Sequence, residues 1–129
     1  MKTLIVCLAL SLSCYSHARQ YVQCSYQTTF DSLVLNLNDN QPTLYLTNGV
    51  HLPDEDRISI LKNVELVSED ANTLIYESND DSTRERIYFP KQQLGRASQY
   101  FTVELELENF ENREFSRRSF SCFSSIYAD

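Results

Sequence analysis

The feature that most limits the fold of this chain is a two-residue alternation of apolar and polar side chains that begins at Gln20. Its clearest stretch is Gln99 to Glu108, where every second residue is apolar: Phe101, Val103, Leu105 and Leu107. An alternation of this period is typical of a β-strand with one buried face, whereas a helix would repeat its apolar residues every three or four positions. The pattern therefore predicts an all-β chain.

Further alternating stretches divide the rest of the sequence into short segments with polar turns between them. They cover 20–26, 33–38, 43–47, 73–78, 85–89 and 114–125. Together they predict about eight strands, a spacing typical of a single antiparallel β-barrel or sandwich. A chain of 129 residues has room for one such domain.

Two segments interrupt the regular pattern. Residues 52–70 carry apolar side chains at both helical and strand spacing, and we favour a strand because strands surround the segment. In the last segment Phe115 and Phe120 have opposite parity. If both faced the core, a β-bulge near Arg117 and Arg118 would be needed to restore the register.

The N-terminal residues have the pattern of a secretory signal peptide. Lys2 precedes the apolar run Leu4 to Leu12, and Ser16 and Ala18 supply small residues at the −3 and −1 positions. We therefore expect cleavage after Ala18, a mature domain over 19–129, and a secreted or periplasmic location. Lipid attachment at Cys14 is disfavoured, because Ser11-Leu12-Ser13 lacks the usual aliphatic residue. No remaining stretch is long and apolar enough to span a bilayer as a helix.

Two cysteines remain after that cleavage, Cys24 near the start and Cys122 near the end. Export would place them in an oxidising compartment, where an even pair is typical of a structural disulfide. The pair predicts that the first and last strands are neighbours.

Composition excludes several functional classes. The chain has only two glycines, too few for a glycine-rich phosphate loop or a nucleophile elbow. A net charge of −7 argues against nucleic acid as a partner. His51 is the only histidine of the mature chain, so neither a hydrolytic triad nor a zinc site is expected, and no cofactor is predicted.

Acidic and aromatic side chains share the predicted outer faces. Glu104, Glu106 and Glu108 alternate along one strand, and Arg113, Arg117 and Arg118 on the returning strand could oppose them. Tyrosines are expected outward on three strands and would offer contact area to a partner. These outward tyrosines are Tyr45, Tyr88 and Tyr100.

A weak calcium candidate lies in one predicted turn. Asn79, Asp80 and Asp81 supply oxygen ligands, but the glycine and spacing of an EF-hand loop are missing. A polar hairpin loop is the interpretation that we favour.

These observations lead to three functional hypotheses. The leading one is a non-catalytic exported domain that binds a protein or another macromolecule through the glutamates and tyrosines named above. The predicted architecture resembles lipocalin-like barrels and small exported inhibitors at the level of the fold, which suggests a carrier of a small apolar ligand as the alternative. The third is a hydrolase that uses paired carboxylates.

Overall fold

The structure, a computed structural model, describes residues 19–26, 32–37, 41–48, 53–56 and 58–127. Within these residues nine antiparallel strands form one sheet that closes almost into a barrel, which confirms the predicted all-β class with one strand more than the approximate count. The strands are β1 (Arg19–Ser25), β2 (Ser32–Leu37), β3 (Thr43–Asn48), β4 (Ile58–Asn63), β5 (Glu65–Glu69), β6 (Thr73–Asn79), β7 (Thr83–Pro90), β8 (Ser98–Asn109) and β9 (Phe115–Tyr127). Two 3-10 turns accompany them, η1 (Asp54–Asp56) and η2 (Lys91–Gln93).

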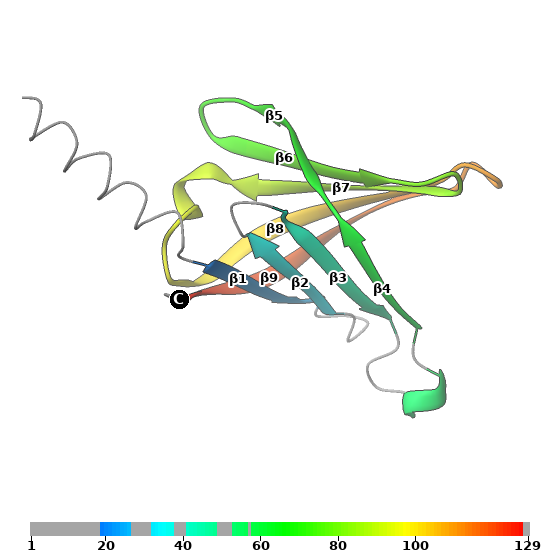
Figure 1. Cartoon of the computed structure of the whole chain (residues 1–129), viewed down its shortest axis with the longest axis horizontal. Helices are drawn as coiled ribbons and strands as arrows, with labels where there is room; N and C mark the ends of the chain where they lie inside the picture. The colour runs from blue at the N-terminus through cyan, green and yellow to red at the C-terminus, as the bar shows by residue number, and fades with distance from the viewer. Residues whose placement is uncertain (1–18, 27–31, 38–40, 49–52, 57, 128–129) are drawn as a thin grey trace, which may run out of the picture.

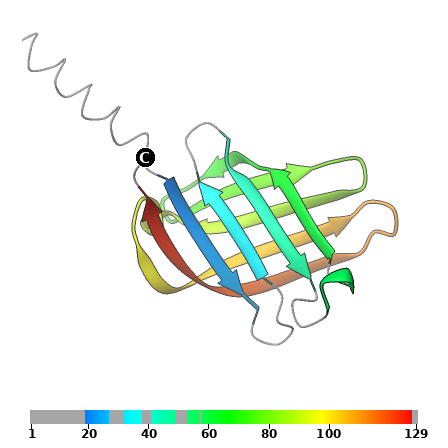
Figure 2. The same ribbon diagram turned by 60° about the horizontal axis from the view of Figure 1, so that its bottom comes forward.

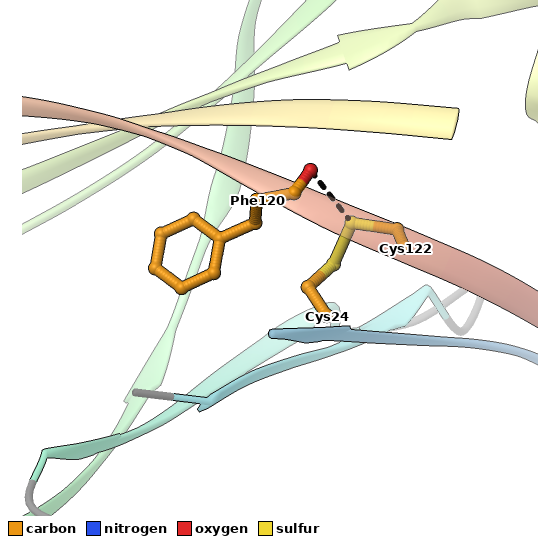
Figure 3. Close-up of a disulfide and its surroundings, with 3 residues drawn as sticks. All are labelled: Cys24, Phe120 and Cys122. Carbon is orange, nitrogen blue, oxygen red and sulfur yellow. Dashed lines mark hydrogen bonds between the residues drawn. A yellow bond between two sulfur atoms is a disulfide. The ribbon is translucent and has the colours of Figure 1, made fainter. Parts of the chain in front are cut away.

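The two terminal strands lie together in the middle of the sheet. The order is β4-β3-β2-β1-β9-β8-β7-β6-β5, and Cys24 pairs directly with Cys122 across β1 and β9. A disulfide joins them with an S–S distance of 2.04 Å, which confirms the predicted link (Figure 3). The Cys122 sulfur also lies 3.6 Å from the carbonyl oxygen of Phe120; this is a contact rather than a hydrogen bond, because an oxidised cysteine has no thiol proton.

The sheet folds over on itself so that strands of its two halves cross at a steep angle (Figures 1 and 2). One half contains β1 to β4 and the other β5 to β8, while the long strand β9 pairs with both β1 and β8. The two outermost strands of the sheet, β4 and β5, are consecutive in the chain, and the fully buried Val64 connects them. Strands that continue from one layer into the next in this way form the corners of orthogonal β-packing.

The core lies between the two halves and is made by inward residues of alternating strands. The inner faces predicted for the strands within 33–38, 43–47, 73–78, 85–89 and 99–108 are confirmed, with Leu107 only partly buried. The cluster includes Val22, Leu33, Leu35, Leu44, Val64, Leu74, Ile87, Phe89, Val103, Leu105 and Phe120. Burial of this apolar area is the main favourable contribution to folding.

One end of the barrel is closed by the segment between β7 and β8. The buried side chain of Gln20 donates hydrogen bonds to the carbonyl of Gln93 (2.7 Å) and the hydroxyl of Ser124 (2.8 Å). Its oxygen accepts a bond from the backbone N–H of Gly95 (2.8 Å), which has a positive φ of 75°. One amide therefore ties the connecting segment to β1 and β9.

The structure shows how the two segments that interrupt the alternating pattern fold. Residues 58–69 form strands, as favoured, and the chain changes layer at Val64. The predicted bulge at Arg117 and Arg118 is wrong, because β8 and β9 pair regularly through both arginines. Phe115 is 61% exposed and does not face the core, so no change of parity is needed.

A bulge does occur elsewhere in the same pair of strands. The register shifts between Gln99 and Phe101, and Tyr100 between them has a positive φ of 64°. The predicted signal peptide (1–18), with Cys14 and Ala18, and also His51 lie outside the described residues. Within the described residues there is no helix with the length and apolar character needed to cross a membrane.

Candidate functional site

The three alternating glutamates of β8 are engaged by arginines of both neighbouring strands. Arg117 of β9 pairs with Glu104 and, at 3.3 Å, with Glu106. Glu108 pairs instead with Arg84 of β7. The cross-strand pairing that the sequence suggested is therefore present through Arg117, and Arg84 engages the third glutamate from the other side of β8.

This ion-paired surface extends over β7 and β6. Arg86 of β7 bonds Glu77 of β6 through Nε (2.9 Å) and a terminal nitrogen (2.7 Å). The Arg117 guanidinium also lies 5.0 Å from the ring centre of Tyr88. We call the outer surface of β6, β7, β8 and the first half of β9 the charged face, since it alternates acids with bases.

The three predicted tyrosines do not share one surface. Tyr88 lies on the charged face beneath Arg117. Tyr45 is 41% exposed on β3, in the other half of the sheet, and Tyr100 is 88% exposed at the bulge of β8. The glutamates and tyrosines of the leading hypothesis are thus divided between two surfaces.

The other half of the sheet has an outer surface of opposite character, which sequence reasoning did not find. Its outward side chains are hydroxyls, amides, aromatics and aliphatics, and in the described part of β1 to β4 the one charged side chain with outward parity is Arg19, the first residue of β1. We call this surface the neutral face. It consists of Ser121, Phe123 and Ser125 of β9, Tyr21, Gln23 and Ser25 of β1, Ser32, Val34 and Asn36 of β2, Thr43, Tyr45 and Thr47 of β3, and Ser59, Leu61 and Asn63 of β4.

The strand register arranges this face in rows that cross the strands. One row contains only hydroxyl side chains: Ser121, Ser25, Ser32, Thr47 and Ser59. The row beside it is bulkier: Phe123, Gln23, Val34, Tyr45 and Leu61. Adjacent positions in a row are about 4.8 Å apart, the spacing of hydrogen-bonded strands.

The surface is hollowed where these two rows meet near β9. One depression of about 410 Å³ is lined by Ser25, Ser121 and Phe123, together with residues of β2. A second, of about 290 Å³, shares those three residues and reaches Tyr100. Hydrogen bonds with Ser59 and Thr47 lower the pKa of Tyr45, so its phenol oxygen is held at the hydroxyl row.

A buried ion pair lies on the inner side of the barrel and was also missed. Glu85 of β7 is 1% exposed, and both of its carboxylate oxygens accept hydrogen bonds from Lys62 of β4, at 2.8 and 2.9 Å. Thr83 accepts a bond from Lys62 (2.8 Å) and donates one to Glu85 (2.9 Å). The sequence alone could have placed Glu85 on the inner face of β7, because Glu85 has the same parity as Ile87 and Phe89.

The turn between β6 and β7 uses its aspartate for structure. The carboxylate of Asp80 accepts the backbone N–H groups of Ser82 and Thr83, both at 2.8 Å, and lies 3.0 Å from the Lys62 ammonium. The described residues contain no group of three or more His, Cys, Asp or Glu side chains that could hold a metal ion. Asn79 and Asp81 lie in the same turn, which joins the paired strands β6 and β7 as a hairpin.

Because of these bonds, the free energy of unfolding depends on the ionisation of Asp80 at acid pH. The N–H group of Thr83, the Lys62 ammonium and the N–H group of Ser82 lower the pKa of Asp80 from 3.8 to about 2. A depressed folded-state pKa stabilises the native state above the unfolded value, and this contribution disappears as the pH falls from 3.8 towards 2.

We therefore expect Asp80→Asn to be less stable than the wild type at pH 7 and to converge with it near pH 2. Asparagine can still accept the turn N–H groups, so the variant removes mainly the charge. Urea unfolding from about pH 2 to pH 7 measures this, with Asp81→Asn in the same exposed turn as the control for net charge. Stability curves that stay parallel for Asp80→Asn and the wild type would contradict the assignment.

Comparison with known proteins adds no relative: no protein-family model, no curated protein and no solved structure matches the chain.

Proposed function

We propose that this chain is a non-catalytic, exported binding module that holds an uncharged polysaccharide on its neutral face. The observation that carries the proposal is the separation of charge between the two outer faces, in a chain with a net charge of −7. Export rests on the signal-peptide pattern, and the disulfide is compatible with an extracellular or periplasmic location. The proposal keeps the macromolecular partner of the leading hypothesis and moves its contact surface away from the paired glutamates.

The scarcity of charge on this face favours an uncharged partner. Charged partners gain orientation and association rate from complementary charges, and nucleic acids require clustered Lys and Arg. Arg19 alone borders the neutral face, which therefore offers no charge cluster to such a partner. It offers hydroxyl and amide groups that both donate and accept hydrogen bonds, which are the groups that match sugar hydroxyls.

The hydroxyl row also favours a sugar over an apolar protein surface. Burying a hydroxyl without a new hydrogen bond costs free energy, and the central parts of protein interfaces are mainly apolar. An oligosaccharide can replace the lost water bonds along the whole row. The spacing of about 4.8 Å between neighbouring strands is comparable to the length of one hexopyranose unit.

Two aromatic rings are placed to stack on sugar rings. Phe123 is 43% exposed and Tyr45 41% exposed, and they occupy the same row with β1 and β2 between them. Three strand spacings separate them by about 14 Å. Aromatic faces bury a large area with little loss of conformational entropy, so these two rings should contribute most of the affinity.

The test is retention of the mature chain on a panel of insoluble neutral polysaccharides, namely cellulose, chitin, starch and a β-1,3-glucan. We expect at least one to retain the protein, with affinity unchanged between low and moderate salt because no ion pair forms. Tyr45→Ala and Phe123→Ala should each weaken binding by about tenfold, as expected for loss of an anchoring ring.

Tyr88→Ala is the matched control, since Tyr88 is a tyrosine of the charged face. Its affinity should equal that of the wild type. The proposal is overturned if no polysaccharide of the panel retains the chain, if retention decreases steeply with salt, or if Tyr88→Ala weakens binding as much as Tyr45→Ala. It is also overturned if the neutral face joins two copies, seen as a dimer mass that Tyr45→Arg reduces to a monomer.

A further inference from the structure

A hollow on the inner side is lined by residues of β4, β7, β8 and β9. Figure 1 shows that the two halves of the sheet diverge towards the β6–β7 and β8–β9 turns at this end. The hollow has a volume of about 590 Å³ and is open to solvent. That is within the range of about 300 to 1,000 Å³ that small-molecule sites occupy. We call it the wedge pocket; it is separate from the neutral face, which lies on the outside.

Apolar side chains form part of the wall of the wedge pocket, beside polar and charged ones. Ile60 comes from β4 in one half, and Leu107 comes from β8 in the other. Leu107 lies at the margin of the core cluster, so the pocket begins where core packing ends. These walls suit the hydrocarbon part of a ligand, because its burial there removes apolar area from water.

The carboxylate of Glu85 is the buried polar group of this pocket. Its Oε1 accepts hydrogen bonds from Lys62 and Thr83, whereas its Oε2 accepts one, from Lys62. A carboxylate oxygen can accept about two hydrogen bonds, so Oε2 has capacity for one further donor. A ligand that brings a donor, rather than another acceptor, matches this group.

The surrounding charges favour a positively charged donor. Acidic groups at or beside the pocket outnumber basic ones by one: Asp80, Glu85, Glu108 and Glu114 against Lys62, Arg84 and Arg118. The Lys62 ammonium is itself held between Glu85 and Asp80. An added cation would therefore balance the local charge, and an added carboxylate would increase the imbalance.

We propose that the wedge pocket binds a small organic amine in its ammonium form, with its apolar part against Ile60 and Leu107 and its nitrogen donating to Glu85. The site is independent of the polysaccharide surface, so the failure of either proposal leaves the other standing. It takes a molecule of limited size, because the core closes its inner end.

Three ligands of equal chain length test the chemistry: hexylammonium, hexanol and hexanoate, each titrated into the oxidised mature protein and followed by NMR chemical shifts. We expect hexylammonium to bind at least about tenfold more tightly than hexanoate, with hexanol between them. Equal affinities for the three, or tightest binding of hexanoate, would overturn the proposal.

Adjacent residues of β4 supply a matched pair of variants. Ile60→Trp fills the pocket and should weaken hexylammonium binding by at least about tenfold, whereas Leu61→Trp places the same ring on the outer face and should leave it unchanged. Glu85→Gln should remove the preference for hexylammonium over hexanol. If Glu85→Gln does not fold, the tryptophan pair still decides: equal affinities in the two variants exclude the wedge pocket as the site.

Discussion

Replacing both cysteines, Cys24→Ala together with Cys122→Ala, is expected to lower the free energy of unfolding by about 4 to 5 kcal/mol. The cross-link joins residues separated by 98 positions, and in the chain-entropy model a loop of that length greatly restricts the unfolded state. Alanine suits the two sites, because both cysteines are buried and a serine hydroxyl would need a partner there.

Urea unfolding of the oxidised wild type and of the double variant measures this difference. The m-value should rise in the variant, since an unfolded chain without the cross-link exposes more surface. Wild-type protein treated with a reductant is the control, and it should unfold at the midpoint of the variant. A loss below about 1 kcal/mol would show that the sheet holds its terminal strands together without the bond.

Lys62→Met is expected to destabilise the protein by about 3 to 5 kcal/mol. The variant leaves the carboxylate of Glu85 buried, with the Thr83 hydroxyl as its remaining donor among the bonds described. Removing one partner of a buried ion pair is costly because the other charge stays in a medium of low dielectric constant.

A second substitution separates this explanation from a loss of packing. Lys62→Met combined with Glu85→Leu removes both charges, and it should recover most of the lost stability, since apolar replacement of a whole buried pair is often neutral. Lys91→Met is the surface control, because Lys91 lies 3.4 Å from the exposed Glu69; its cost should stay below about 1 kcal/mol. A double variant less stable than Lys62→Met would contradict the assignment.

Much of the fold follows from the alternation of side chains, because a period of two assigns each residue to a face without knowledge of its neighbours. Leu33 and Leu35, or Val103 and Leu105, could be placed inside on that basis, and Cys24 and Cys122 then placed the terminal strands side by side. The error at Arg117 arose from assuming that every phenylalanine is buried. Phe115 is the first residue of β9 and lies in the last pair between β8 and β9, where little covers it.

Less of the candidate sites than of the fold could be predicted from the sequence, because these sites depend on which strands lie next to one another. Ser25 and Ser59 are unremarkable in sequence, and only the register across β1, β2, β3 and β4 places them in one row. The contact between Lys62 and Glu85 depends on the crossing of two layers, which no local pattern encodes. Glu85 could have been recognised as inward from its parity, but its partner could not.

The position of β1 beside β9 has a consequence for how the chain folds. Consecutive strands pair throughout β1–β4 and throughout β5–β9, so among the strands of the described residues only β1 and β9 pair while distant in sequence. Each of these two arrays can form by local hairpin steps, which are fast. The slow step is then the joining of the first strand to the last. The central seam of the sheet therefore stays open until β9 has been synthesised and can reach β1.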